Sequence, residues 1–174
     1  MESDKCTQCG PGAPPEYRLR IASEHDEPLL FELFCTARAP DFSACEPALG
    51  QQLLQMQYRA QRNTYQAQFP LASRYVIEDD LEVPIGSLLY EDTPEAVRLI
   101  DIAILPAFRN RGIGTSIIEK LQQAALKKDV PVCLSVFRLN PARVLYLRLG
   151  FTETDGNELY QSMQWKYQST GGLR

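Results

Sequence analysis

The residues best suited to chemistry lie in a short loop between a predicted apolar strand and a predicted apolar helix. The strand ends at Leu105, and residues 109–115 read Arg-Asn-Arg-Gly-Ile-Gly-Thr. The first N–H groups of a helix lack acceptors within the helix and lie at the positive end of its dipole, so they attract an anion. Two glycines let the anion approach the backbone, while Arg109 and Arg111 add positive charge. We therefore predict that this loop binds an anion such as a phosphate group.

Two other phosphate-binding loops do not fit these letters. A P-loop needs GxxxxGK followed by Ser or Thr, and the segment around Gly112 has neither the second glycine at that spacing nor the lysine. A dinucleotide-binding loop needs GxGxxG, but the position three beyond Gly114 is Ile117. Both of these loop types are excluded here.

A second informative stretch reads VCLSVFRLNPARVLYLRLGF. Its first part is almost continuously apolar, which is typical of a strand covered on both faces. Asn140 follows, then a short helical segment that carries Tyr146 and ends at Gly150, a candidate left-handed cap. The stretch therefore predicts a buried strand, a turn and a short helix in succession.

The two stretches together resemble the motifs of the GNAT acetyltransferase superfamily, whose first motif reads (Arg or Gln)-x-x-Gly-x-(Gly or Ala). The matching positions in the two motifs are Arg109, Gly112, Gly114, Asn140, Tyr146, Gly150 and Phe151. The resemblance covers residues 75–167, and the first 70 residues match only in the order of their elements. It implies a single α/β domain with a mixed, mostly antiparallel sheet of about seven strands flanked by helices.

The resemblance also implies a ligand, acetyl-CoA, acting as a cosubstrate with no metal. The backbone of residues 109–115 would hold its pyrophosphate, and the strand edge at residues 102–104 would pair with the pantetheine arm. Asn140 and Tyr146 would lie near the acetyl thioester. The expected binding residues are Ile102, Ala103, Ile104, Arg109, Asn110, Arg111, Gly112, Ile113, Gly114, Thr115, Asn140, Arg143 and Tyr146.

Acetyl transfer from sulfur to an amine needs an uncharged amine, a polarised carbonyl and a proton for the leaving thiolate. Tyr146 is the candidate acid, because a phenol with a pKa of about 10 roughly matches a thiol leaving group. The alternative is that its ring only packs against the sheet. A backbone N–H near Ile104 would polarise the carbonyl. Asp101 is the candidate base, and strand alternation predicts that it shares a face with Leu99 and Ala103.

Other reactive groups are given structural interpretations. The acidic residues within 78–92 are expected to form solvated turns. Cys133 lies in an apolar strand without a neighbouring histidine or lysine, so direct transfer in a ternary complex is favoured over an acetyl-cysteine. Cys6 and Cys9 form one CxxC, but a zinc site needs four ligands and His25 is the only histidine.

The sequence thus predicts an N-acetyltransferase for a small-molecule or peptide amine. A noncatalytic acyl-CoA-binding or sensing module, which would not need Tyr146, is the alternative, and a structural phosphate-binding domain is a third. With 18 Lys and Arg against 22 Asp and Glu, the net charge of −4 argues against general binding to nucleic acid or an anionic membrane. The chain lacks a signal-peptide pattern, so the expected location is cytoplasmic, and a homodimer is compatible with the sequence.

The elements that must position these residues can be read from the hydrophobic pattern. Strands are predicted at residues 17–21, 74–78, 83–90, 97–105, 131–137, 151–154 and 159–167, and helices at 24–37, 47–67, 112–128 and 141–149. The strand–helix–strand order over residues 97–137 predicts a parallel crossover. The acetyltransferase domain is expected over residues 16–168, between a flexible leader at 1–15 and a flexible tail at 169–174.

Overall fold

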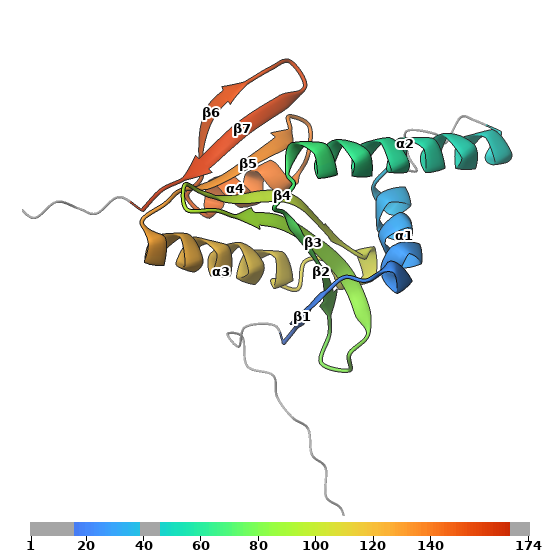
Figure 1. Cartoon of the computed structure of the whole chain (residues 1–174), viewed down its shortest axis with the longest axis horizontal. Coiled ribbons are helices and arrows are strands. Elements are labelled where there is room, and N and C mark those ends of the chain that lie inside the picture. Colours follow the sequence, from blue (N-terminus) through green and yellow to red (C-terminus); the bar gives the residue numbers. More distant parts are fainter. Residues whose placement is uncertain (1–15, 39–45, 168–174) are drawn as a thin grey trace, which may run out of the picture.

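The structure, a computed structural model, describes residues 16–38 and 46–167. The predicted leader and tail, together with Cys6 and Cys9, lie outside the described residues. Within the described part, seven strands form one sheet in the order β1-β2-β3-β4-β5-β7-β6. This confirms the predicted α/β fold with a mixed sheet flanked by helices (Figure 1).

Each predicted element is present, with its ends shifted by a few residues. The strands are β1 (Arg18–Ile21), β2 (Ser73–Glu78), β3 (Pro84–Asp92), β4 (Val97–Ile104), β5 (Val132–Phe137), β6 (Thr152–Gly156) and β7 (Tyr160–Trp165). The helices are α1 (Glu27–Arg38), α2 (Pro47–Gln68), α3 (Ile113–Lys128) and α4 (Ala142–Arg148). Short 3-10 turns, η1 (Glu24–Asp26) and η3 (Pro106–Phe108), precede α1 and follow β4.

The strands β1 to β4 form an antiparallel meander, and β5, β7 and β6 form a second antiparallel group. The two groups are joined by a parallel pairing of β4 with β5, and α3 makes the predicted crossover between them. Helices α3 and α4 cover one face of the sheet, while α1 and the end of α2 lie on the other (Figure 1). None of the helices in residues 16–38 and 46–167 is long and apolar enough to cross a membrane.

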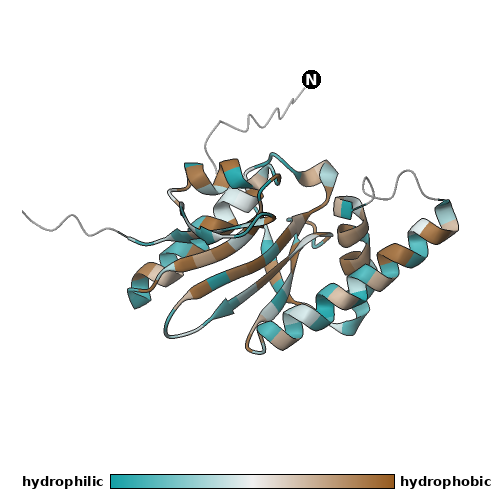
Figure 2. Cartoon of the chain, turned by 90° about the horizontal axis from the view of Figure 1, so that it is seen from above, coloured by the Kyte–Doolittle hydropathy of each residue, from teal (hydrophilic) through white to brown (hydrophobic). Residues whose placement is uncertain are grey.

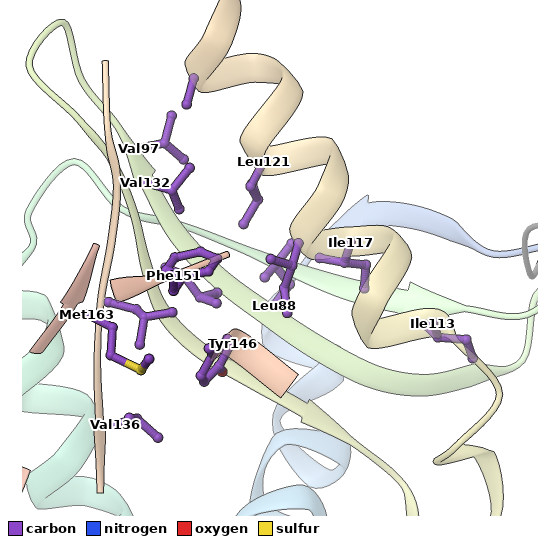
Figure 3. Close-up of a cluster of buried hydrophobic side chains, with 14 of the residues drawn as sticks. Leu88, Val97, Ile113, Ile117, Leu121, Val132, Val136, Tyr146, Phe151 and Met163 are labelled. Atoms are coloured by element: carbon purple, nitrogen blue, oxygen red, sulfur yellow. The ribbon is translucent and has the colours of Figure 1, made fainter. Parts of the chain in front are cut away.

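The main core lies between the sheet and the helices α3 and α4 (Figure 3). Ile117 and Ile118 of α3 pack with Leu88 and Val97 of the central strands, and each is at most 1% exposed. Figure 2 shows the corresponding apolar colouring of the central strands beside a largely polar α2. The apolar residues of α3 therefore pack on the sheet, as their spacing predicts. This packing fixes the position of the helix that follows the predicted anion-binding loop.

A β-bulge in β4 changes which face its residues occupy. Leu99 is opposite Tyr90 on β3 while Asp101 is opposite Leu89, so Ile100 is an extra residue in the ladder. Adjacent residues of β3 point to opposite faces, and Leu99 and Asp101 therefore do so as well. The prediction that these two residues share a face is wrong, because strict alternation cannot foresee an inserted residue. Ala103, opposite Ser87, does share the face of Asp101.

The bulge also marks the point where β4 and β5 separate. Their pairing comprises Val97 with Val132, Arg98 with Cys133 and Leu99 with Leu134, and it ends there. Beyond Leu99, β4 continues to Ile104 and β5 continues to Phe137, with no pairing between them in this part of the described sheet. The sheet is thus split at its centre, on the side where the predicted anion-binding loop begins.

A charged network fastens β1 to the rest of the sheet. Arg20 donates two hydrogen bonds to Asp26, at 2.9 and 2.8 Å, and a third to Glu78 at 2.8 Å. Asp26 and Glu78 are only 8% and 5% exposed, and the Arg20 guanidinium shares their hydrogen bonding with Ser23 and Arg18, respectively. Its donation is the largest cause that lowers the pKa of each carboxyl below its usual range.

We expect Arg20→Met to destabilise the fold by about 1–3 kcal/mol, because it removes three charge-assisted hydrogen bonds to two buried carboxylates. Urea unfolding measures this, with the exposed Arg59→Met on α2 as the matched control. Because the pKa values of Asp26 and Glu78 are lowered in the folded state, the wild type should exceed the variant in free energy of unfolding by the full amount above the ordinary carboxyl pKa of about 4. This difference should disappear as the pH falls toward the lowered pKa values. An advantage that stays constant on acidification would contradict this assignment.

Candidate active site

Two residues with left-handed backbone conformation shape the predicted anion-binding loop. Asn110 has φ 60° and Gly112 has φ 83°, so the chain twice enters the left-handed region before α3 begins. The first helical hydrogen bond runs from Ser116 N–H to the Gly112 carbonyl. The N–H groups of residues 113–115 therefore have no acceptor within the helix and lie at its positive end. This is the geometry that an anion needs.

The two loop arginines have different contacts. Arg109 donates from Nε to the carbonyl of Ile104 at 2.8 Å, which ties the loop to the last residue of β4. This contact uses one of the five guanidinium donors. Arg111 stacks over the Phe108 ring, with its guanidinium carbon 5.0 Å from the ring centre. Both arginines thus help to shape the loop in addition to supplying charge.

The fold has room for a Cβ atom at Gly114. A Cβ placed there would lie 3.8 Å from Ile104 Cδ1 and 3.9 Å from Leu145 Cδ2, which is ordinary van der Waals contact. The fold itself therefore does not require a glycine at this position. Gly112 differs, because its positive φ is strained for any residue with a side chain.

Tyr146 extends from α4 into the core beside the separated strands (Figure 3). It is 6% exposed, and its ring centre lies 5.8 Å from that of Phe151. Burial is the main cause that raises the pKa of its phenol to about 12, and the charge of Asp101 adds to the effect. The two predicted catalytic residues, Tyr146 and Asp101, are therefore near enough for the charge of Asp101 to act on the phenol of Tyr146.

Asp101 is held on the face opposite α3 by the bulge. Arg74 of β2 lies in the same cross-strand row, since both residues are opposite Leu89. Arg74 Nη1 is 3.7 Å from Asp101 Oδ2, which is longer than a normal hydrogen bond. Burial raises the pKa of the Asp101 carboxyl, and the nearby Arg74 only partly opposes this. The carboxyl nevertheless keeps 34% of its side-chain surface open to solvent.

Tyr65 of α2 joins this group, although sequence reasoning did not identify it. Burial raises the pKa of its phenol to about 12, with further contributions from Asp101 and Tyr160. Gln61 Nε2 donates to its hydroxyl at 3.3 Å. The sequence signal that could have found Tyr65 is its position seven residues after Tyr58, which places both tyrosines on one face of α2.

Asn140 and Arg143 have structural partners. Asn140 Oδ1 accepts a hydrogen bond from Ala142 N–H at 2.9 Å and so shapes the start of α4. Arg143 forms an ion pair with Glu153 of β6. Both side chains thereby help to position α4, which carries Tyr146. In the described residues, no group of three or more His, Cys, Asp and Glu side chains is arranged to hold a metal ion.

Comparisons with known structures support the fold. The PaiA N-acetyltransferase of Thermoplasma acidophilum, solved in complex with coenzyme A, is 17% identical; the alignment covers 87% of this chain and 99% of that one, with a TM-score of 0.65. A GNAT family acetyltransferase of Elizabethkingia anophelis with acetyl-CoA bound is 15% identical, over 87% and 99% of the two chains, with a TM-score of 0.56. An acetyltransferase of Thermus thermophilus is 20% identical, over 87% and 97%, with a TM-score of 0.59.

A sequence comparison points the same way. Residues 70–153 match the family described as the acetyltransferase (GNAT) domain. This span contains the bulged strand, the loop and the whole of the second predicted motif, including Tyr146. The comparison with curated proteins gave no match. The matched span shows a GNAT acetyltransferase domain over residues 70–153, and the described residues share the fold of these acetyltransferase structures.

Proposed function

We propose that this protein transfers an acetyl group from acetyl-CoA to a primary amine of a small molecule or peptide. The observation that carries the proposal is the succession of three features along one opening in the sheet. The anion-binding loop stands at one end, the unpaired part of β4 follows, and Tyr146 and Asp101 come next. Together they supply a phosphate site, a backbone edge and two proton-transfer groups.

Acetyl-CoA fits the binding features that the chain offers. Its pyrophosphate needs backbone N–H donors, which residues 113–115 would supply at the start of α3. Its pantetheine arm carries amide groups, which would pair with β4 at residues 102–104, where β5 has moved away. Two of the similar structures contain coenzyme A or acetyl-CoA, which supports this choice of ligand.

Asp101 is suited to the role of general base. An attacking amine must lose a proton, and a carboxyl whose pKa is raised by burial accepts that proton more readily than an ordinary one. Its exposed surface gives an amine access to the carboxyl. Arg74 then acts as a positioning residue, since it holds the carboxyl from the next strand but one.

Tyr146 is suited to the role of acid at the leaving sulfur. Its pKa of about 12 keeps the phenol protonated at neutral pH, so the hydroxyl is always available as a donor. The same shift makes it a weaker acid than a free phenol, because burial disfavours the phenolate and the charge of Asp101 adds to this effect. We therefore assign Tyr146 first to a hydrogen bond on the sulfur, with proton transfer as negative charge develops there.

Direct attack on the thioester is favoured over a covalent route through Cys133. This cysteine is paired with Arg98 in the part of the sheet that precedes the separation of β4 and β5. Its recorded polar contact is with the amide of Gln164, whose Nε2 lies 3.6 Å from the sulfur. An amide does not remove the thiol proton, so it does not activate the sulfur as a nucleophile.

The proposal predicts that acetyl-CoA and coenzyme A raise the melting temperature, and that a panel of primary amines releases coenzyme A thiol. The release follows from an acetyl group moving to nitrogen, and mass spectrometry of the amine should show the added acetyl group. Stabilisation by ATP alone would contradict the ligand assignment. Stabilisation by acetyl-CoA without acetylation of any amine would support a noncatalytic binding module instead.

The loop assignment predicts that Gly112→Val and Arg109→Ala weaken acetyl-CoA binding while the protein stays folded. The valine strains a positive-φ position and crowds the N–H donors, and the alanine removes a charge-assisted contact of about 1.5–3 kcal/mol, or roughly tenfold to more than a hundredfold in Kd. Calorimetric titration measures the affinity. Lys127→Ala, at the other end of α3, is the charge-matched control and should bind normally. Unchanged affinity in both loop variants would mean that the anion binds elsewhere.

The role of Tyr146 predicts that Tyr146→Phe lowers kcat by about 10²- to 10⁴-fold, because the ring remains but its donor is lost. The KM for acetyl-CoA should change far less. Tyr58→Phe on α2 is a matched loss of a buried hydroxyl outside the site and should keep its kcat. If Tyr146→Phe keeps full kcat when chemistry limits the rate, the side chain only packs.

A further inference from the structure

Two exposed aromatic rings lie at the open ends of the strands that pass the site. Phe137 ends β5 and Tyr160 begins β7, and the two residues are opposite each other in the ladder. Their ring centres are 5.8 Å apart in an edge-to-face arrangement. They remain 40% and 43% exposed, so each ring keeps surface that a ligand can contact.

A third ring, Tyr65, lies near the end of α2, on the face of the sheet opposite α3. Phe137 points to that same face, because it alternates with the buried core residue Val136. Arg98 of β4 stacks over the Phe69 ring at 5.7 Å, which holds the end of α2 above the sheet. Tyr65 lies one turn earlier on α2, with its ring centre 6.5 Å from that of Phe69. Its phenol is near enough to Asp101 and Tyr160 for both to act on it electrostatically. Figure 1 shows the same proximity between the end of α2 and the strands β5 and β7.

We propose that Tyr65, Phe137 and Tyr160 form an aromatic acceptor site beside Asp101, and that this site selects a primary amine carried on a flat, apolar group. The proposal rests on the acetyltransferase function proposed above. The amine nitrogen would bind at the Asp101 carboxyl, and the apolar body would lie against the rings, where aromatic contacts add to the area that is buried.

The charge next to Asp101 favours an acceptor whose body is uncharged. Arg74 Nη1 lies 3.7 Å from Asp101 Oδ2, and Arg38 also acts on this carboxyl. A second ammonium group placed beside these guanidiniums would be repelled. The exposed rings of Phe137 and Tyr160 offer an apolar surface for an uncharged body instead.

The experiment compares 2-phenylethylamine with ethanolamine, which carry the same aminoethyl group on a phenyl ring and on a hydroxyl. We expect kcat/KM to be at least about tenfold higher for 2-phenylethylamine, since only its ring contacts the aromatic site. Equal or better turnover of ethanolamine, or of spermidine, would overturn this inference and leave the proposed acetyltransferase function intact. If none of the three amines is acetylated by protein that binds acetyl-CoA, the inference also fails.

Variants provide the second half of the test. Phe137→Ser and Tyr160→Ser should raise the KM for 2-phenylethylamine by about tenfold and leave the KM for acetyl-CoA unchanged. Both side chains are exposed enough for the truncated proteins to fold, and melting temperatures check this. Tyr167→Ser removes a ring that is 54% exposed beyond the other end of β7 and should have no effect. Unchanged amine KM values in the folded variants would overturn the aromatic site.

Discussion

The separation of β4 from β5 is the constraint on which the rest of this structure depends. Two neighbouring parallel strands would normally pair along their whole length, yet here pairing stops at Leu99, where one extra residue enters β4. Beyond the bulge, β4 stays paired with β3 but lacks a strand partner on the side of β5, and such an edge needs hydrogen bonds from another source. It also turns Asp101 away from the core. One local irregularity thus creates the edge for a ligand and the orientation of a candidate base.

The chemistry of the site follows from charges held in surroundings with little water. Asp101 has one long ion pair with Arg74, and burial is the main cause of the raised pKa values of Asp101, Tyr146 and Tyr65. The site therefore holds a carboxylate that accepts a proton readily and two phenols that keep theirs. In bulk water, solvent would screen the charge of the carboxylate, and the effect of that charge on the pKa of a nearby phenol would be smaller.

The scaffold holds these groups by contacts remote from the chemistry. The apolar face of α3 fixes the start of the helix under the loop, and the Arg109 bond to Ile104 ties that loop to β4. Asn140 and Arg143, expected to contact the ligand directly, are engaged in shaping and bracing α4. Their recorded contacts show that a residue within a motif can serve the site by positioning a neighbour such as Tyr146.

The sequence by itself determined the elements, their order and the position of the loop before α3, because hydrophobic periodicity, helix ends and glycine positions are local properties. The strand–helix–strand order over residues 97–137 was enough to predict the crossover from β4 through α3 to β5. Only the tertiary structure decided the face of Asp101, since a bulge depends on the register with β3. It alone brought Arg74 and Tyr65 near Asp101, because these residues come from a strand and a helix whose proximity is set by long-range packing, for which no local pattern exists.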